Sequence, residues 1–259
     1  MKVAVSGKGG VGKTTLSAAL AKVLADEGLS VVAIDADPDA NLAQAFGLTE
    51  RRITPLVEMK GLIHERTGSE PGTYGTYFKL NPTVSDIPDE FGIDVGGIRL
   101  LTLGTIYQGG SGCACPENVF LKALLMHLVL QRDEAVVVDM EAGLEHLGRA
   151  TVTGIDALLV VVEPGLRSVQ TAEQTVRLAA DIGLKHVFAV GSKVRTEAHR
   201  RFLAERMTAL PLLGNLSYNE AVAEADLNGD AVFEAAPALL DEVRAVRAAL
   251  DVALARTEE

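Results

Sequence analysis

The sequence has no tryptophan, and aromatic residues make up only 4% of its 259 residues. It has two cysteines and no apolar run near the roughly 20 residues that a membrane-spanning helix requires. Lys and Arg number 24 against 35 Asp and Glu, which gives a formal net charge of -11. This composition excludes a disulfide scaffold and a transmembrane protein. It also argues against a sequence-independent nucleic-acid binder, which needs basic side chains to neutralise phosphates.

The N-terminal segment lacks the pattern expected of an export signal. "MKVAVSGKGG" passes directly from a strand-like segment into a glycine loop, without the basic region, apolar stretch and cleavage site of a signal peptide. We therefore expect a cytoplasmic protein with no membrane and no nucleic-acid partner. In that reducing compartment, two closely spaced cysteines are expected to bind metal or to carry redox chemistry.

Apolar segments rich in β-branched residues alternate with helical patterns along the chain. Both faces of these segments are apolar, as in the buried strands of a parallel sheet. They are residues 2–6, 31–35, 98–104, 135–140, 157–164, 186–192 and 210–216. Residues 14–27 and 167–182 repeat apolar positions at helical spacing, and each is followed by a glycine. The alternation predicts an α/β fold, with a mostly parallel sheet covered by helices on both faces and ligands at the carboxyl ends of the strands.

The length and composition predict a single domain over residues 1–259. Residues 50–96 interrupt the alternation with many Gly and Pro, and they predict a loop-rich insertion after a short helix at about 55–66. Residues 237–256 predict a terminal helix whose apolar side chains are mainly Ala, Val and Leu. We expect this helix to pack on the protein, because a membrane-docking helix carries bulky apolar residues opposite a basic face.

The strongest motif is the glycine-rich segment "GKGGVGKTT", residues 7–15, between the first strand and the first helix. It fits the pattern G-x-x-x-x-G-K-[ST] of a P-loop, in which backbone N–H groups and a helix N-terminus surround the phosphates of a nucleotide. Lys13 is expected to bridge the β- and γ-phosphates, Thr14 to hold Mg²⁺, and Thr15 to reach the α-phosphate. The expected nucleotide-binding residues here are Gly7, Gly9, Gly10, Val11, Gly12, Lys13, Thr14 and Thr15.

Acidic residues follow two of the predicted strands, at the edge where the phosphate loop lies. Asp139 ends the strand "AVVVD" and is expected to contact Mg²⁺ through water, as a Walker B carboxylate does. In "DADPDANL", residues 35–42, a carboxylate at the strand end can orient the attacking water. Asp35 is expected to pack at the base of the loop or to lie in the outer shell of the magnesium. Asp39 is expected to cap a helix that begins near it, and the role of Glu141 stays open.

Cys113 and Cys115 are separated by a single alanine in a glycine-flanked segment. A disulfide between them would be strained and would restrain little of the unfolded chain. Both sulfurs can instead face one ion, but a tetrahedral thiolate site needs about four ligands. One chain therefore offers half a metal site.

The phosphate loop carries a second lysine, Lys8, and "KGGVGKT" resembles the deviant P-loop of the family that contains MinD, ParA, ArsA and the nitrogenase iron protein. The resemblance implies that Lys8 reaches across a homodimer to phosphates held by the partner subunit, so that its charge favours hydrolysis in the closed dimer. It also implies that Asp37, the aspartate before proline, orients the attacking water, and that Gly143 contacts the γ-phosphate region. The catalytic set that the resemblance implies is Lys8, Lys13, Asp37 and Asp139.

The same resemblance points to a nucleobase site at "GSKV", residues 191–194, and at "LPLLGNLSYNEAV", residues 210–222, which resembles the family's base-flanking loop. Ser192 stands where the family often has asparagine, and Lys193 stands at the family's lysine. We expect ATP and ADP with Mg²⁺ as the ligands. GTP stays open as an alternative, because the sequence does not identify the residues that discriminate the bases.

The cysteine pair resembles a narrower group. C-x-C followed by "PENVF", together with "DMEAGLEHLGR" and "ITPLVEMKGLIHERTG", resembles the CooC group of accessory ATPases for nickel-containing carbon monoxide dehydrogenase. The resemblance implies an ATP-hydrolysing metallochaperone that dimerises with nucleotide and has that dehydrogenase as its client. Two copies of Cys113 and Cys115 would then supply four thiolates to Ni²⁺ or Zn²⁺ at the dimer interface.

Two other functions stay open at this point. Four thiolates across a dimer also suit an iron–sulfur cluster carrier or scaffold ATPase. A positioning ATPase like MinD or ParA is the second alternative, and the acidic charge and the cysteine pair argue against it. Electron transfer to a reductase is disfavoured, because the nitrogenase iron protein carries another cysteine after its Walker B strand and this chain has none there.

Overall fold

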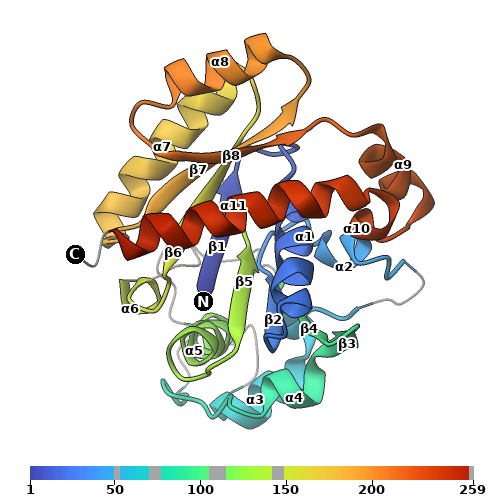
Figure 1. Ribbon diagram of the computed structural model, residues 1–259. Coiled ribbons are helices and arrows are strands. Elements are labelled where there is room, and N and C mark those ends of the chain that lie inside the picture. The colour runs from blue at the N-terminus through green and yellow to red at the C-terminus, as the bar shows by residue number, and fades with distance from the viewer. Residues whose placement is uncertain (50–52, 70–76, 105–114, 142–148, 257–259) are drawn as a thin grey trace.

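The computed structural model describes residues 1–49, 53–69, 77–104, 115–141 and 149–256. Its centre is an eight-stranded sheet in the order β3-β4-β2-β5-β1-β6-β7-β8 (Figure 1). Every neighbouring pair is parallel except β3 and β4. The strands are β1 (Lys2–Gly7), β2 (Val31–Asp35), β3 (Ile93–Val95), β4 (Ile98–Thr102), β5 (Ala135–Asp139), β6 (Ala157–Val162), β7 (Val187–Val194) and β8 (Leu212–Ser217). The mostly parallel sheet predicted from the sequence is confirmed.

Helices cover both faces of this sheet. They are α1 (Lys13–Asp26), α2 (Leu42–Ala45), α3 (Lys60–Thr67), α4 (Ile87–Phe91), α5 (Pro116–Leu130), α6 (Arg149–Val152), α7 (Leu166–Ile182), α8 (Glu197–Arg206), α9 (Glu220–Asn228), α10 (Val232–Ala235) and α11 (Pro237–Ala255). Alternate side chains of a strand enter different cores. In β1, Ala4 lies in the core with α5 and α7, whereas Val3 and Val5 lie in the core with α1 and α11. This division explains why the strands are apolar at successive positions.

The central strands place the candidate site at one edge of the sheet. In the β2–β5 register Asp35 pairs with Asp139, and in the β1–β5 register Val5 pairs with the same Asp139. The segment after Gly7 therefore leaves β1 beside both acidic strand ends. This is the carboxyl edge, where ligands of parallel α/β sheets bind.

The structure refines two local expectations. Residues 50–96 contain a 3₁₀ turn at Leu56–Glu58, then α3, α4 and β3, so the short helix expected at about 55–66 is divided into two pieces. The expectation of a strand buried on both faces at 210–216 is wrong. β8 is an edge strand, and of its side chains only Leu216 is fully buried, because β8 has a neighbour on one side alone.

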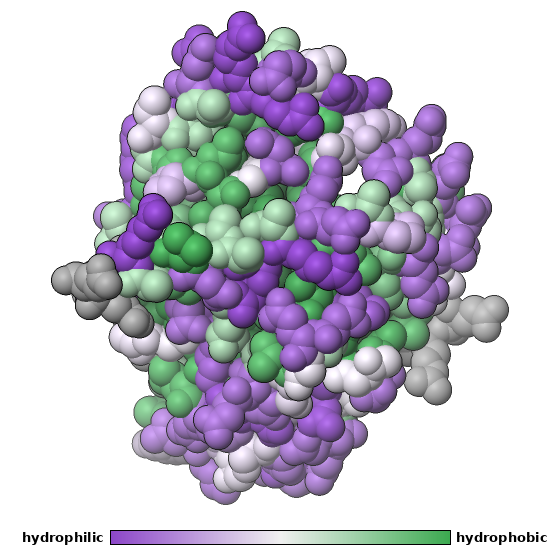
Figure 2. Space-filling view, viewed as in Figure 1, coloured by the Kyte–Doolittle hydropathy of each residue, from purple (hydrophilic) through white to green (hydrophobic). Residues whose placement is uncertain are grey.

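The terminal helix α11 packs against the sheet and against α1 (Figure 1). It buries a row of four apolar side chains, which are Leu239, Val243, Val246 and Leu250. Its outer side carries ion pairs, including Arg244 with Asp241 at 2.8 Å. Figure 2 shows hydrophilic residues over much of the face that α11 crosses, with apolar residues between them in separate patches. None of the helices in the described part of the chain is long and apolar enough to cross a membrane.

Candidate nucleotide-binding site

The phosphate loop joins the end of β1 to the start of α1. Gly7 has φ 149°, and a Cβ atom there would lie 2.6 Å from the carbonyl oxygen of Val161. Gly12, at the N-cap of α1, has φ 98°, and a Cβ atom there would lie 3.1 Å from the hydroxyl of Ser192. Both positions require glycine, because an L-residue resists these angles and a side chain would meet neighbouring atoms. The loop thus brings its backbone close to β6 and β7.

The loop opens into a cavity of about 860 Å³ at the N-terminus of α1. A volume of this size suits a nucleotide, and the positive end of a helix favours phosphate. The cavity brings together residues of the loop, of the β2 and β5 ends and of the segments near the ends of β7 and β8. Its lining includes Gly9, Gly10, Gly12, Lys13, Thr14, Thr15, Asp37, Asp39, Glu141, Ser192, Lys193, Tyr218 and Asn219. The sequence-predicted residues of three separate segments therefore meet around one cavity.

Lys13 and Asp37 form an ion pair at the cavity wall. The Lys13 Nζ lies 3.4 Å from Asp37 Oδ2, and the two side chains are 8% and 15% exposed. The backbone N–H of Asp37 donates to Asp35 Oδ1 at 3.2 Å, which fixes the turn after β2. Asp37 is thus held beside the phosphate loop with a carboxylate that can reach the cavity.

Asp139 is fully buried at the end of β5 and accepts two hydrogen bonds from α1. The Thr14 hydroxyl donates to Oδ2 at 2.7 Å, and the Ser17 hydroxyl donates to Oδ1 at 3.0 Å. Burial raises the pKa of Asp139 to about 6, although these two hydrogen bonds and the charge of Lys13 lower it. Ser17 was missed from the sequence. Its position one helical turn after Thr14 places the two hydroxyls on the same face of α1.

The oxygen donors at this point fit Mg²⁺. A hydroxyl and a carboxylate are hard oxygen ligands, and they lie together at the start of the helix that follows the phosphate loop. Thr14 would hold the ion directly and Asp139 would hold it through water. The bound Mg²⁺ would neutralise charge on the phosphates.

Asp35 is buried at the base of the loop after β2, which is one of the two placements expected for it, and the sequence did not reveal its bond to α2. Its Oδ2 accepts a hydrogen bond from the backbone N–H of Leu42 at 2.9 Å, at the start of α2. The expectation that Asp39 caps this helix is wrong. The helix begins at Leu42, so Asp39 is too far before it, and Asp39 instead donates its own N–H to Asp37 at 3.0 Å. The carboxylate of Asp35 therefore joins the end of β2 to α2.

Burial raises the pKa of Asp35 to about 7, and the nearby negative charge of Asp139 adds to this, while the Leu42 N–H lowers it. The folded protein therefore binds a proton at Asp35 more tightly than the unfolded chain, whose aspartate has the ordinary value of 3.8. It follows that the free energy of unfolding falls as pH rises from about 4 to about 7, because the unfolded aspartate gives up its proton near the lower value and the buried carboxyl keeps it up to the higher one.

We expect Asp35→Asn to remove part of this pH dependence. Between about pH 4 and pH 8 the free energy of unfolding of the variant should fall by on the order of 4 kcal/mol less than that of the wild type, because the amide has no charge to bury. The amide oxygen can replace only one of the two carboxylate oxygens that accept from the Asp37 and Leu42 N–H groups, so the variant should be less stable than the wild type near pH 4. Urea unfolding of the nucleotide-free protein in a chelating buffer measures the difference. The matched control is Asp181→Asn, at an exposed position on α7, which should keep the wild-type slope. An unchanged slope in Asp35→Asn would contradict the role of burial.

Lys8 lies in the phosphate loop but does not line the cavity of its own chain. Its Nζ is 3.8 Å from Glu163 Oε1, and the two side chains are 39% and 33% exposed. Glu163 directly follows β6 and was missed, because nothing in the local sequence links it to residue 8. The ammonium group is directed toward the start of α7 and is accessible from outside the subunit.

The far side of the cavity contains the expected nucleobase residues and three others. Ser192 is buried beside Gly12, and Lys193 has φ 54° and donates through Nζ to the carbonyl oxygen of Gly10. Tyr218 and Asn219 line the same side, and the Arg195 guanidinium lies 3.5 Å from the centre of the Tyr218 ring. These aromatic and amide groups were not singled out from the sequence. Tyr218 and Asn219 lie within residues 210–222, the segment that resembles the family's base-flanking loop.

Other predicted site residues lie outside the described residues. Gly143 and Cys113 are among them. Cys115 is described and is half-buried at the N-cap of α5, where its carbonyl oxygen accepts a hydrogen bond from Val119 N at 3.1 Å. The helix α5 begins directly after Cys115, at Pro116. Within the described ranges there is no group of three His, Cys, Asp or Glu side chains arranged to hold a metal ion.

Comparison with known proteins supports the reading of this site. Residues 2–232 match the family model described as the CobQ/CobB/MinD/ParA nucleotide binding domain. The chain is 46% identical over 253 residues to the carbon monoxide dehydrogenase accessory protein CooC of Rhodospirillum rubrum, covering 96% of each protein. It is 44% identical over 231 residues to an uncharacterized ATP-binding protein of Methanocaldococcus jannaschii, covering 88% of this chain and 90% of the other.

Solved structures share the fold. A chain of the MinC:MinD cell division protein complex of Aquifex aeolicus matches with a TM-score of 0.68 at 18% identity, covering 95% of each chain. A ParA family ATPase of Chlorobium tepidum matches with a TM-score of 0.69 at 18% identity, covering 96% of this chain and 97% of the other. The resemblance inferred from the motifs is confirmed. The chain belongs to the CobQ/CobB/MinD/ParA family of nucleotide-binding proteins and is an ATPase of that family.

Proposed function

We propose that this protein is an accessory ATPase for nickel-containing carbon monoxide dehydrogenase, and that it carries the metal between two subunits of a nucleotide-dependent homodimer. The observation that carries the proposal is the 46% identity to CooC over nearly the whole of both chains. A match of that extent includes the phosphate loop, both acidic strand ends and the cysteine pair in one continuous alignment. The cytoplasm is the proposed location, since its reducing conditions keep the cysteines as thiols.

The nucleotide part of the proposal rests on the cavity at the carboxyl edge. Lys13 binds the β- and γ-phosphates of ATP, and its partner Asp37 orients the attacking water, since the two side chains already meet at 3.4 Å. Thr14 holds the magnesium ion, and Asp139 orients Thr14 through their hydrogen bond. Ser192, Lys193 and the Tyr218 segment surround the base and ribose. Gly143 is proposed to contact the γ-phosphate.

The metal part rests on thiolate chemistry and on the place of Cys115. Thiolates suit soft and borderline ions such as Zn²⁺ and Ni²⁺, and two C-x-C pairs supply the four ligands that such a site requires. Cys115 lies at the N-terminus of α5, whose partial positive charge stabilises a thiolate. In the proposed dimer the metal is cargo, bound when ATP closes the subunits and released to the dehydrogenase when hydrolysis loosens them.

The direct test is metal content against molecular mass. Anaerobic protein given Ni²⁺ or Zn²⁺ with a nonhydrolysable ATP analogue is expected to elute as a dimer carrying about one metal ion, whereas Cys113→Ala with Cys115→Ala should elute as a dimer without metal. The ADP form should contain less dimer. The variant's nucleotide affinity, measured in parallel, should equal that of the wild type, because neither cysteine lies in the phosphate loop.

Two outcomes would overturn the metal part of the proposal. One is unchanged metal content in the double variant, which would place the ion on other ligands. The other is brown protein with visible absorbance and several irons per dimer, which would make the same thiolates the ligands of an iron–sulfur cluster. A metal-free monomer throughout would leave an ATPase whose cysteines have a different purpose.

A further inference from the structure

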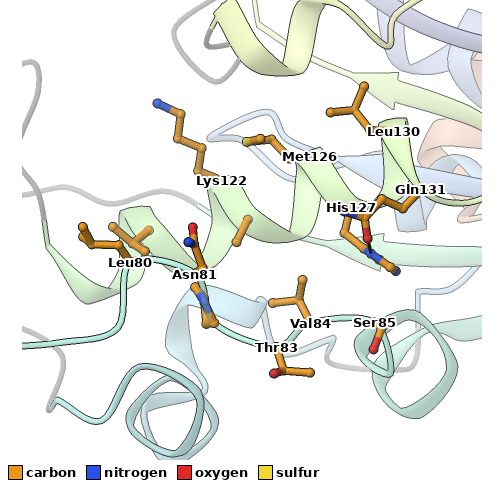
Figure 3. A pocket seen from close by; sticks show the side chains of 13 residues that line it. Leu80, Asn81, Thr83, Val84, Ser85, Lys122, Met126, His127, Leu130 and Gln131 are labelled. Atoms are coloured by element: carbon orange, nitrogen blue, oxygen red, sulfur yellow. Dashed lines mark hydrogen bonds between the residues drawn. The ribbon is translucent and has the colours of Figure 1, made fainter.

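A second hollow lies far from the nucleotide, between the outer face of α5 and the segment before α4. It has a volume of about 420 Å³, and 13 residues line it, all of them within the ranges 80–85 and 119–131 (Figure 3). Figure 3 shows Leu80 and Asn81 at one end of the hollow, Val84 and Thr83 across from α5, and His127 with Gln131 at the other end. The hollow is partly open to solvent. We call it the α5 groove.

The α5 groove presents apolar side chains to solvent. Leu80 is 68% exposed and Leu130 is 45% exposed, and they lie toward opposite ends of it. Met126 lies between them on α5, half-buried, with a flexible thioether that adapts to different partner side chains. Tyr77, three residues before Leu80, is fully exposed. Apolar side chains gathered in this way mark a surface that a partner covers, whereas single exposed leucines do not.

The charged side chain in the lining of the α5 groove is basic. Its 13 lining residues include Lys122 and no aspartate or glutamate, although the chain as a whole has a formal net charge of -11. Lys122 is exposed and forms no ion pair with the described residues. An occupant that complements this surface carries apolar side chains and at least one carboxylate.

The groove extends to the first turn of α5, which begins directly after Cys115. Val119 lines its end nearest the cysteines, and the Val119 N–H donates to the carbonyl oxygen of Cys115 one turn earlier in α5. A partner segment bound along α5 therefore lies one helical turn from the proposed metal ligand. A protein that receives the metal ion must come this close to the cysteines that hold it.

We propose that the α5 groove is the docking surface for the client protein, and that it takes a segment of the client that carries apolar side chains next to a carboxylate. This inference rests on the proposed function for the identity of the client. The apolar side chains cover Leu80, Met126 and Leu130, and the carboxylate pairs with Lys122. Docking on α5 then places the client beside the cysteines without covering the nucleotide cavity.

The test measures binding of this protein, in its ATP-analogue and metal-bound form, to purified nickel-free carbon monoxide dehydrogenase. Leu80→Glu with Leu130→Glu is expected to raise the Kd at least about 10-fold, because two charges enter an apolar contact. Lys122→Glu is expected to raise it about 3- to 10-fold and to weaken its dependence on salt. The matched control is Leu178→Glu on α7, where the leucine is 43% exposed, as Leu130 is at 45%, and binding should not change.

The outcomes separate this inference from the proposed function. ATP hydrolysis and metal content should equal wild type in all these variants, since none of the residues lies in the nucleotide cavity or the cysteine pair. Wild-type affinity for the dehydrogenase in both groove variants overturns the docking surface and leaves the proposed function standing. No binding by the wild-type protein overturns both. A change of dimer mass in the groove variants, with client binding intact, shows that a second copy of this chain is the occupant.

Discussion

Replacing Lys13 with alanine is expected to lower the rate of ATP hydrolysis by at least about 100-fold, which corresponds to about 2.7 kcal/mol of transition-state stabilisation. Lys13 carries the positive charge of the phosphate loop that faces the cavity. Its side chain is 8% exposed, and its Nζ lies 3.4 Å from Asp37 Oδ2. Because the Lys13 side chain is shielded from solvent, its positive charge interacts strongly with the negative charge that develops on the phosphates in the transition state. A water molecule cannot replace that interaction. Phosphate release at saturating ATP gives the rate, and equilibrium binding of a fluorescent ATP analogue shows how much of the loss is binding.

The control for this experiment is Lys22→Ala. Lys22 lies on the same helix, nine residues later, and pairs at the surface with Asp26. Its loss should change hydrolysis by less than about twofold, because an exposed pair contributes little. A Lys13→Ala variant that hydrolyses ATP within about threefold of wild type would show that the cavity at α1 is not the place of the reaction.

Lys13→Ala has a second expected consequence, which a merely misfolded variant would not show. The positive charge of Lys13 lowers the pKa of the buried Asp139, against the larger effect of burial. Without it Asp139 should bind its proton more tightly in the folded state. The stability of the nucleotide-free variant should therefore fall more steeply with rising pH than that of the wild type.

The features that the sequence predicted correctly are those encoded by short contiguous segments. The buried strands appear as apolar runs, because a parallel sheet has a core on both faces. The phosphate loop is a motif of nine residues, and its glycines are required by the backbone of the loop itself, as at Gly12. The acidic ends of β2 and β5 could be placed together, because neighbouring parallel strands end at the same edge.

Contacts between distant segments could not be predicted. The hydrogen bond from Lys193 to Gly10 joins residues separated by 183 positions, and the pair of Lys8 with Glu163 likewise depends on the strand order of the sheet. The hydrogen bond between Asp35 and α2 could not be predicted for a different reason. Both Asp35 and Asp39 lie shortly before Leu42 in the sequence, so either carboxylate could accept its N–H. The geometry of the turn, which composition does not determine, brings Asp35 into hydrogen-bond distance.

Lys8 is expected to act on the nucleotide of the partner subunit, and mixing two inactive variants distinguishes this from action within one chain. Lys8→Ala and Asp37→Asn should each hydrolyse ATP at least about 30-fold more slowly than wild type when assayed alone. In a mixed dimer, one site keeps Asp37 from the Lys8→Ala subunit and receives Lys8 from the Asp37→Asn subunit. That site is complete if Lys8 works across the interface, and no site is complete if Lys8 works on its own nucleotide.

An equal mixture should therefore recover about a quarter of the wild-type rate, since about half of the dimers are mixed and each has one working site of two. The geometry favours this result. Within one subunit Lys8 contacts Glu163 at 3.8 Å and does not line its own cavity, and its side chain is 39% exposed, so a second subunit can be reached. The control mixes Lys8→Ala with Lys8→Ala carrying Asp37→Asn, which leaves no Lys8 in the solution and should stay inactive. If the mixture hydrolyses ATP only at the mean rate of the two variants assayed alone, Lys8 acts on the nucleotide of its own subunit. In that case Lys8 would stay paired with Glu163 in every state. The expected result instead means that Lys8 pairs with Glu163 only in the open state and leaves it when the dimer closes.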